Sequence, residues 1–307
     1  MGDDERNEYL YKFVCADKYK PLNRAANRGL LDSGTLFVAR FDPGGSGSWM
    51  PLVWGQNGLV PENGFADQAE VLIKTRQAAD RMGATMMDRP EWIASHPITR
   101  EVYMTLTNNN RRGTNPPSGN NPDGTTRAGN ARPAGDAANR RADNRYGHII
   151  RWRESMGKVD ATEFGWDIFV ECGDKLAPQP HLRGNIIGDD CGAPDGLWFD
   201  QDGRLWIQTD QIGNATGDWT NIGGNVMLCV DPSTGVTHVF LPRRRTAKSP
   251  ALPIPRMAKP CSSAFSTLAR IGKLVIPKTR LGPTAASMAE LRRAGPDRRP
   301  SPDHRWW

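Results

Sequence analysis

Short runs of apolar residues, separated by turn-forming residues, recur along the first 241 residues of the chain. The runs are rich in β-branched and aromatic side chains, and several alternate apolar with polar positions, which indicates strands. We expect strands at 9–14, 34–41, 101–107, 148–154 and 166–170.

Two later segments have the pattern of β-hairpins. Apolar runs flank an Asp-Gln-Asp-Gly turn at 200–203, and a similar pair of runs flanks an Asp-Pro-Ser-Thr-Gly turn at 231–235. Repeated antiparallel strand pairs with Asp and Gly turns are typical of β-propeller blades.

One helix and several loops complete the pattern. Apolar residues at helical spacing, including Val71 and Ala78, predict a helix over 65–81. Residues 108–145 contain almost no large apolar side chain, so we expect a long polar surface loop there. The Gly-Gly-Ser-Gly-Ser sequence at 44–48 predicts a hairpin turn. The predicted fold class is all-β: a partial β-propeller with a helix near 65–81 and long surface loops.

The charge distribution divides the chain in two. Residues 242–307 contain 15 Lys and Arg against 3 Asp and Glu, whereas residues 1–241 contain 25 against 31. We therefore expect a propeller domain at 1–241 and a basic tail at 242–307, which lacks strand alternation. An acidic domain repels phosphodiester backbones, so no nucleic-acid partner is expected. Carboxylates gathered around metal ions would supply part of the acidic excess.

The sequence also bears on compartment and cysteine chemistry. No run of 18 apolar residues is present, so no membrane span is expected. The acidic N-terminus does not resemble a secretory signal, which predicts a cytoplasmic location for the chain as given. The five cysteines form no CxxC pair, and we expect them to be buried thiols that pack as small hydrophobes.

The candidate chemistry begins at Met87-Asp88-Arg89-Pro90-Glu91-Trp92. In an extended segment, Arg89 and Glu91 lie on the same face, because side chains alternate along a strand. The guanidinium can grip a phosphate bidentately, and the carboxylate can hold a hard metal ion. The alternative is a solvated ion pair.

Several further segments carry a family resemblance, and they keep their order over 2–240. They are Gly2-Asp3-Asp4-Glu5-Arg6, Glu62-Asn63-Gly64-Phe65, Thr75-Arg76-Gln77, Leu106-Thr107-Asn108-Asn109, Gly147-His148-Ile149-Ile150-Arg151-Trp152-Arg153-Glu154 and Pro194-Asp195-Gly196-Leu197. With the Asp-Arg-Pro-Glu-Trp segment, they resemble the C-terminal half of PhoX-type alkaline phosphatases.

This resemblance implies a propeller-shaped, periplasmic or secreted phosphomonoesterase that uses calcium and iron. It makes Arg89 a phosphate-gripping catalytic residue, and it makes Glu91, Glu154 and Asp195 metal ligands. The substrate would be a phosphomonoester small molecule. Without the resemblance, Glu154 could pair with Arg151 or Arg153, and Asp195 could cap a turn.

The sequence departs from the family in two places. The family's N-terminal half, with further ligands for iron, is not matched, so an incomplete and inactive fragment is expected, with that half as its partner. Shifting permitted codons of 254–270 by one nucleotide gives a strand-like sequence that resembles the family's continuation. A frameshift near Pro242 would therefore explain the basic tail.

Two alternatives to a phosphatase remain open. One is a non-catalytic propeller fragment that binds cations. The other is a calcium-dependent esterase or lactonase propeller, which shares acidic channel ligands but does not need Arg89.

Overall fold

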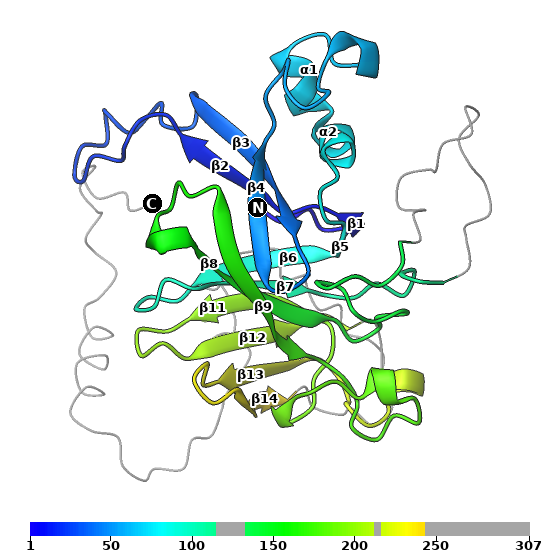
Figure 1. Cartoon of the computed structure of the whole chain (residues 1–307). Coiled ribbons are helices and arrows are strands. Elements are labelled where there is room, and N and C mark those ends of the chain that lie inside the picture. The colour runs from blue at the N-terminus through cyan, green and yellow to red at the C-terminus, as the bar shows by residue number, and fades with distance from the viewer. Residues whose placement is uncertain (115–132, 212–215, 243–307) are drawn as a thin grey trace, which may run out of the picture. The chain divides into compact units, whose positions relative to one another are not determined.

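The computed structural model describes residues 1–114, 133–211 and 216–242, all within a unit that spans 1–250. The strands of this part form three sheets (Figure 1). The largest sheet has the order β2-β3-β4-β9-β8-β7-β6. Its strands are β2 Tyr11–Cys15, β3 Gly34–Phe41, β4 Ser46–Pro51, β6 Pro90–Ser95, β7 Val102–Leu106, β8 His148–Glu154 and β9 Glu163–Glu171.

The second sheet has the order β10-β14-β13-β12-β11, with antiparallel pairs except between β10 and β14. Its strands are β10 Ile187–Gly188, β11 Pro194–Phe199, β12 Leu205–Thr209, β13 Val226–Val230 and β14 Val236–Pro242. The two predicted hairpins are present as β11–β12 and β13–β14. A third, small sheet pairs β1 Arg6–Glu8 with β5 Met87–Asp88.

One hydrophobic core joins the two large sheets. Buried side chains of β7, β8 and β9 meet those of β11, β12 and β13, and the contributing residues include Tyr103, Ile149, Val170, Leu197, Leu205, Ile207 and Leu228. On β12 the buried positions alternate, as expected for a strand with one face in the core. β11, an edge strand of the second sheet, lies alongside β6 and β7 (Figure 1).

The predicted helix at 65–81 is confirmed as a helical segment, but it is divided in two. Helix α1 spans Gln68–Ile73 and helix α2 spans Thr75–Met82, with Lys74 between them at φ −94° and ψ 37°. Val71, Ala78 and Ala79 point into a core with β2 and β3. Short 3-10 turns occur at Pro61–Asn63, Ser155–Gly157, Pro180–Leu182 and Gly217–Trp219.

The segment at 108–145 differs from the expected surface loop at both ends. On either side of 115–132, which lies outside the described residues, polar side chains are buried: Asn109, Arg112, Asn139, Arg141 and Asn144. Composition did not reveal this, because the burial is supported by hydrogen bonds rather than by apolar side chains. The predicted tail at 242–307, with its frameshift, also lies outside the described residues except for Pro242, which ends β14.

Candidate functional site

Arg89 occupies the one-residue junction between β5 and β6. Its backbone has a left-handed φ of 59°, rather than the extended conformation that the sequence suggested. The carbonyl of Arg89 accepts a hydrogen bond from the Thr107 amide at 3.1 Å, which ties the junction to the end of β7. The turn therefore belongs to the sheet's hydrogen-bonding pattern.

Arg89 and Glu91 form an ion pair, which was the alternative interpretation of this segment of the sequence. Nη2 of Arg89 lies 3.3 Å from Oε1 of Glu91 and 2.8 Å from Oδ1 of Asp4. The Glu91 side chain is 13% exposed, whereas that of Asp4 is 52% exposed. Arg89 is thus held between a mostly buried acid on β6 and a largely exposed acid from the N-terminal segment.

Asp195 joins this group from the second sheet. It lies near the start of β11, and its backbone carbonyl accepts a hydrogen bond from Thr105 Oγ1 at 2.7 Å. The same Thr105 hydroxyl accepts a hydrogen bond from the Trp92 amide at 3.0 Å. One buried threonine on β7 therefore fixes β11 against β6, which brings two of the predicted ligands together.

The acids of this group are electrostatically crowded. Burial, followed by hydrogen bonding with Asp4 and the negative charge of Asp195, raises the pKa of Glu91 to about 9. Burial also raises the pKa of Asp195, and the charges of Asp210 and Asp4 act in the same direction. Oδ1 of Asp195 is buried and receives no hydrogen bond from a donor. A nearby cation would relieve each of these costs.

The structure does not bring Glu154 to this group. The strand register places Pro90 opposite Leu106 and Leu106 opposite His148, so Glu154 lies at the far end of β8 from Arg89. Oε2 of Glu154 accepts hydrogen bonds from Lys12 Nζ at 3.1 Å and from Trp49 Nε1 at 3.0 Å.

The alternative partners of Glu154 are engaged elsewhere. Arg151 pairs with Asp167 and Arg153 pairs with Glu101. An ion pair is therefore the observed arrangement of Glu154, with Lys12 rather than a neighbouring arginine as its partner.

Two acids of the group were not among the predicted site residues. Asp4 was visible only as part of the acidic run at 3–5. Asp210 follows β12, and its amide donates to the carbonyl of Ala193 at 2.9 Å. This hydrogen bond attaches Asp210 to the residue that precedes β11. Neither position has a local sequence signal for a ligand. Asp4 and Asp210 lie far from Arg89 along the chain, and only the pairing and packing of the strands brings them to it.

The donor set suits a hard cation in its chemistry, since every candidate ligand is a carboxylate oxygen. Within 1–114, 133–211 and 216–242, however, no three His, Cys, Asp or Glu side chains are grouped closely enough to hold a metal ion. The Arg89 guanidinium, which lies between Asp4 and Glu91, supplies the positive charge beside these carboxylates. The residues thus fit as part of a cation site rather than as a whole one.

A buried polar network holds the residue that precedes Arg89. The preceding residue, Asp88, is fully buried, and its Oδ1 lies 2.6 Å from Nε of the fully buried Arg112. Asn109 donates to Asp88 Oδ1 at 2.9 Å, and Asn144 donates to Asp88 Oδ2 at the same distance. These contacts attach both ends of the 108–145 segment to β5.

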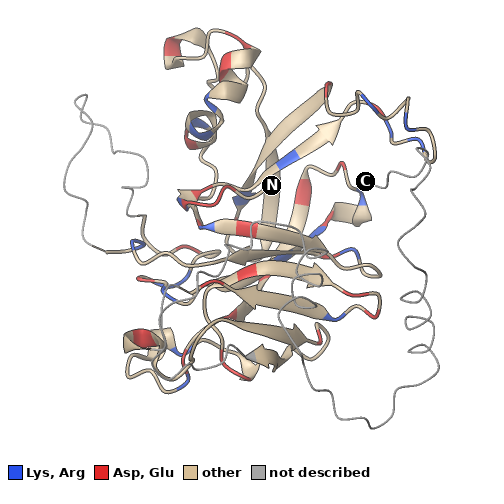
Figure 2. Ribbon diagram, turned by 180° about the vertical axis from the view of Figure 1, so that it is seen from behind, with Lys and Arg blue, Asp and Glu red and all other residues tan. Residues whose placement is uncertain are grey.

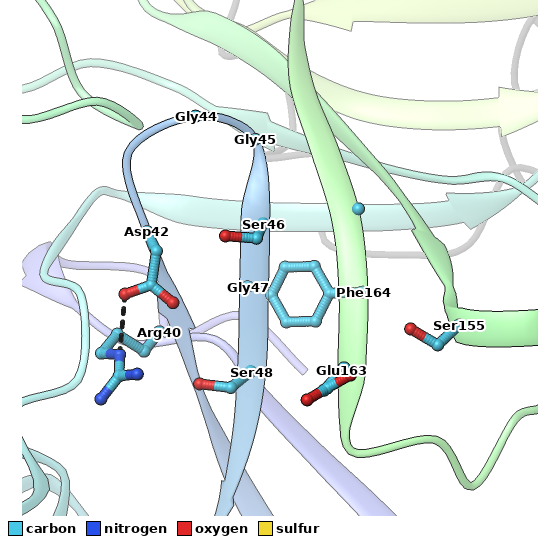
Figure 3. Close-up of a pocket in the computed structure, with 11 residues that line it drawn as sticks. Arg40, Asp42, Gly44, Gly45, Ser46, Gly47, Ser48, Ser155, Glu163 and Phe164 are labelled. Atoms are coloured by element: carbon cyan, nitrogen blue, oxygen red, sulfur yellow. Dashed lines mark hydrogen bonds and ion pairs between the residues drawn. The ribbon is translucent and has the colours of Figure 1, made fainter.

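An open pocket lies elsewhere, beside the hairpin of β3 and β4 (Figure 3). Its lining includes the exposed pair of Arg40 and Asp42, 2.9 Å apart, together with Ser46, Glu163 and Phe164. The predicted hairpin turn is present, but it ends at Gly45, because residues 46–48 already belong to β4. No histidine lines the pocket, so it offers no base for a serine nucleophile.

Charge and hydropathy give two further observations. Acidic and basic segments are interspersed along both large sheets (Figure 2), without a continuous basic face in the part of the chain that the structure describes. No described helix is long and apolar enough to cross a membrane.

Comparison with known proteins gives two matches. A family model described as alkaline phosphatase PhoX matches residues 1–249. The solved structure of Pseudomonas fluorescens PhoX, in complex with the transition-state analogue vanadate, is 44% identical to the chain, with a TM-score of 0.68. No curated protein matches the chain.

The structural match covers 78% of this chain and 41% of the Pseudomonas protein, so the chain spans less than half the length of that relative. PhoX has a β-propeller-like fold, which confirms the predicted partial propeller. By its family match and by its 44% identity to a solved member, the chain belongs to the PhoX alkaline phosphatase family.

Proposed function

We propose that this chain supplies the phosphate-binding arginine and part of the metal-ligand set of a metal-dependent phosphomonoesterase. The observation that carries the proposal is the meeting of Arg89 with Glu91 and Asp195, two poorly solvated acids from different sheets. In this proposal Asp4 and Asp210 complete the acidic surroundings. The substrate is a small phosphomonoester, and the compartment is the periplasm or the exterior, as the family implies.

Arg89 is suited to exchange one partner for a substrate. Its contact with Asp4 is with a carboxylate that is 52% exposed, and such pairs contribute about 1 kcal/mol or less. A phosphate dianion offers two oxygens to the guanidinium, so it can accept two charge-assisted hydrogen bonds at the same time. Arg89 would therefore exchange its contact with Asp4 for one with the phosphate. Its contact with Glu91 would keep the guanidinium oriented.

Glu91 and Asp195 are the residues that would hold a cation, and calcium suits their oxygen donors. A bound metal ion would polarise the phosphoryl oxygen and lower the pKa of an attacking water. An iron site rests on the family resemblance alone. The role of Glu154 as a ligand stays a prediction, and its neighbours Lys12 and Trp49 favour a structural ion pair instead.

The test combines binding with turnover on the purified chain. Calcium is added to metal-free protein, and the melting temperature is followed in the wild type, Glu91→Gln and Asp195→Asn. We expect calcium to raise the melting temperature of the wild type by a few degrees, and to have little effect on either variant. Glu163→Gln, which removes an exposed acid from the pocket of Figure 3, should respond like the wild type.

Hydrolysis of p-nitrophenyl phosphate, with and without calcium and iron, then separates the functional alternatives. Metal-dependent turnover that falls by 100-fold or more in Arg89→Ala, an expectation of about 3 kcal/mol, supports a phosphatase. Calcium binding without turnover supports a cation-binding fragment that needs the rest of a PhoX protein as partner. Hydrolysis of p-nitrophenyl acetate or a lactone, unaffected by Arg89→Ala, would support the esterase alternative and contradict the proposal.

A further inference from the structure

Cys172 and Cys191 lie in direct contact inside the core that joins the two large sheets. Their Sγ atoms are 3.2 Å apart, and the two residues are 0% and 1% exposed. Two thiols at this distance are closer than ordinary sulfur contacts in a packed core. The two cysteines are 19 residues apart along the chain, so the proximity of their sulfurs arises from the fold.

The backbone around the two cysteines is held by its own hydrogen bonds. Cys172 directly follows β9 of the seven-stranded sheet, and Cys191 precedes β11 of the five-stranded sheet. Gly173 forms an antiparallel bridge with Cys191, and its amide donates to the Cys191 carbonyl at 3.0 Å. The cysteines therefore meet between two paired segments, a position from which a small shift of the side chains joins the sulfurs.

The segment between the cysteines is attached to the core by three buried apolar side chains, Ala177, Leu182 and Ile186. It contains the short strand β10 and the turn Pro180–Leu182, and Leu176 and Ile187 are exposed. Its ends are held by the ion pair of Lys175 and Asp190, which are 3.0 Å apart and partly exposed. A covalent link across this segment would restrict the unfolded chain, which is the main way in which a disulfide stabilises a fold.

We propose that Cys172 and Cys191 form a structural disulfide when the chain folds in an oxidising compartment. The two thiols lose two protons and two electrons as the sulfur–sulfur bond forms. The oxidant is a protein or small-molecule disulfide, which accepts the electrons and is released as two thiols. The inference does not depend on the proposed phosphatase activity.

The chemistry of Cys191 indicates when the bond forms. Its hydrogen bond with Cys172 and its burial raise the pKa of the Cys191 thiol well above the ordinary value. The thiolate is the attacking species in disulfide exchange, so the folded core resists both oxidation and reduction. The bond therefore forms before the segment closes over the two sulfurs, during folding.

The disulfide would also stiffen the chain segment between Cys191 and Asp195, which belongs to the candidate site. Asp195 lies four residues after Cys191, and the intervening Ala193 has a left-handed φ of 53°. The Ala193 carbonyl accepts a hydrogen bond from the Asp210 amide, and the Ala193 amide donates to the Tyr146 carbonyl at 2.8 Å. A bond at Cys191 would hold this turn covalently, in addition to the hydrogen bond that the Cys191 carbonyl accepts from the Gly173 amide.

The test is a count of free thiols in the full chain, refolded once with an oxidised and reduced glutathione mixture and once with excess reductant. Each sample is denatured, labelled with iodoacetamide and digested with trypsin. After oxidising refolding we expect a linked pair of peptides, 159–175 and 184–204, that separates on reduction. Three of the five cysteines should take the label in that sample, and all five in the reduced sample.

Thermal melting tests the structural role. Wild type refolded with excess reductant, which lacks the disulfide, should melt about 5 °C or more below wild type refolded with the glutathione mixture. Cys172→Ala should melt at the same temperature with or without reductant, whereas the control Cys229→Ala, on β13, should keep the wild-type response. Labelling of all five cysteines after oxidising refolding, or linkage of either cysteine to a third one, would overturn the proposal.

Discussion

His148, the first residue of β8, is a neutral histidine in a buried polar network. Its Nε2 lies 2.8 Å from the Ala138 carbonyl and its Nδ1 lies 3.1 Å from Asn144 Nδ2. A carbonyl can only accept, so the single ring proton sits on Nε2 and Asn144 donates to Nδ1. Burial, opposed by Asp88 and reinforced by Arg141, lowers the pKa of His148 to about 4.

This histidine predicts a loss of stability in acid. Its pKa is depressed in the folded state, so its contribution is present above pH 6.5 and is lost as the pH falls toward 4. The unfolded chain binds the proton over that window, which lowers the free energy of unfolding by about 3 kcal/mol. Urea denaturation at pH 7 and pH 4.5 measures the effect.

His148→Gln is the matched control for this prediction. The glutamine amide can still donate to the Ala138 carbonyl, but it does not titrate. The variant should therefore lose less stability than the wild type between the two pH values. Equal losses in both proteins would show that other groups, such as the paired carboxylates, account for the acid sensitivity.

At the scale of the elements, the buried ion pair of Arg112 and Asp88 connects the 108–145 segment to β5, in addition to the hydrogen bonds from Asn109 and Asn144. Arg112 Nε contacts Asp88, while Nη1 donates to the Ala134 carbonyl at 3.0 Å and Nη2 donates to the Met86 carbonyl at 2.6 Å. The guanidinium is fully buried, and its hydrogen bonds go to both flanks of the segment and to the strand. β5 is two residues long, so it depends on this anchor to hold the Arg89 turn.

Arg112→Met should therefore destabilise the fold by about 3–5 kcal/mol, because it leaves the Asp88 carboxylate buried without its cation. The control is Arg40→Met, which breaks the exposed pair with Asp42 and should cost about 1 kcal/mol or less. Both values come from urea denaturation at pH 7. A cost for Arg112→Met as small as that of Arg40→Met would contradict the anchoring role.

At the scale of the whole molecule, the core between the two large sheets defines a unit that ends at Pro250. The family match ends at nearly the same place, at residue 249. The sequence-based boundary at 241 lies at the last residues of β14, and it stays a prediction until a truncated chain is made.

A chain that stops after Pro250 tests this boundary. We expect its melting temperature to lie within about 2 °C of that of the full chain, because it keeps every strand and core that the structure describes. Calcium should also raise its melting temperature as in the full chain. Aggregation or a large fall in melting temperature would show that residues 251–307 contribute to the fold.

The outcome for each predicted residue follows from the range of the interaction involved. Arg89 and Glu91 are two residues apart, and the ion pair between them was the alternative interpretation of the sequence, although the backbone at Arg89 is left-handed rather than extended. Glu154 was grouped with them by resemblance, but the strand register separates it from them by the length of β8. The helix at 65–81 was recognised by its period, whereas its break at Lys74 was not.

Local patterns in the sequence predicted β2, β3, β7, β8, β9, the two hairpins and the family, because these depend on alternating side chains, turn residues and ordered motifs within short windows. The tertiary structure decided which acids meet Arg89, which polar residues of the 108–145 segment are buried, and that Cys172 meets Cys191. Those contacts join segments that lie far apart along the chain. Their partners are set by strand order and register, which a local pattern does not specify.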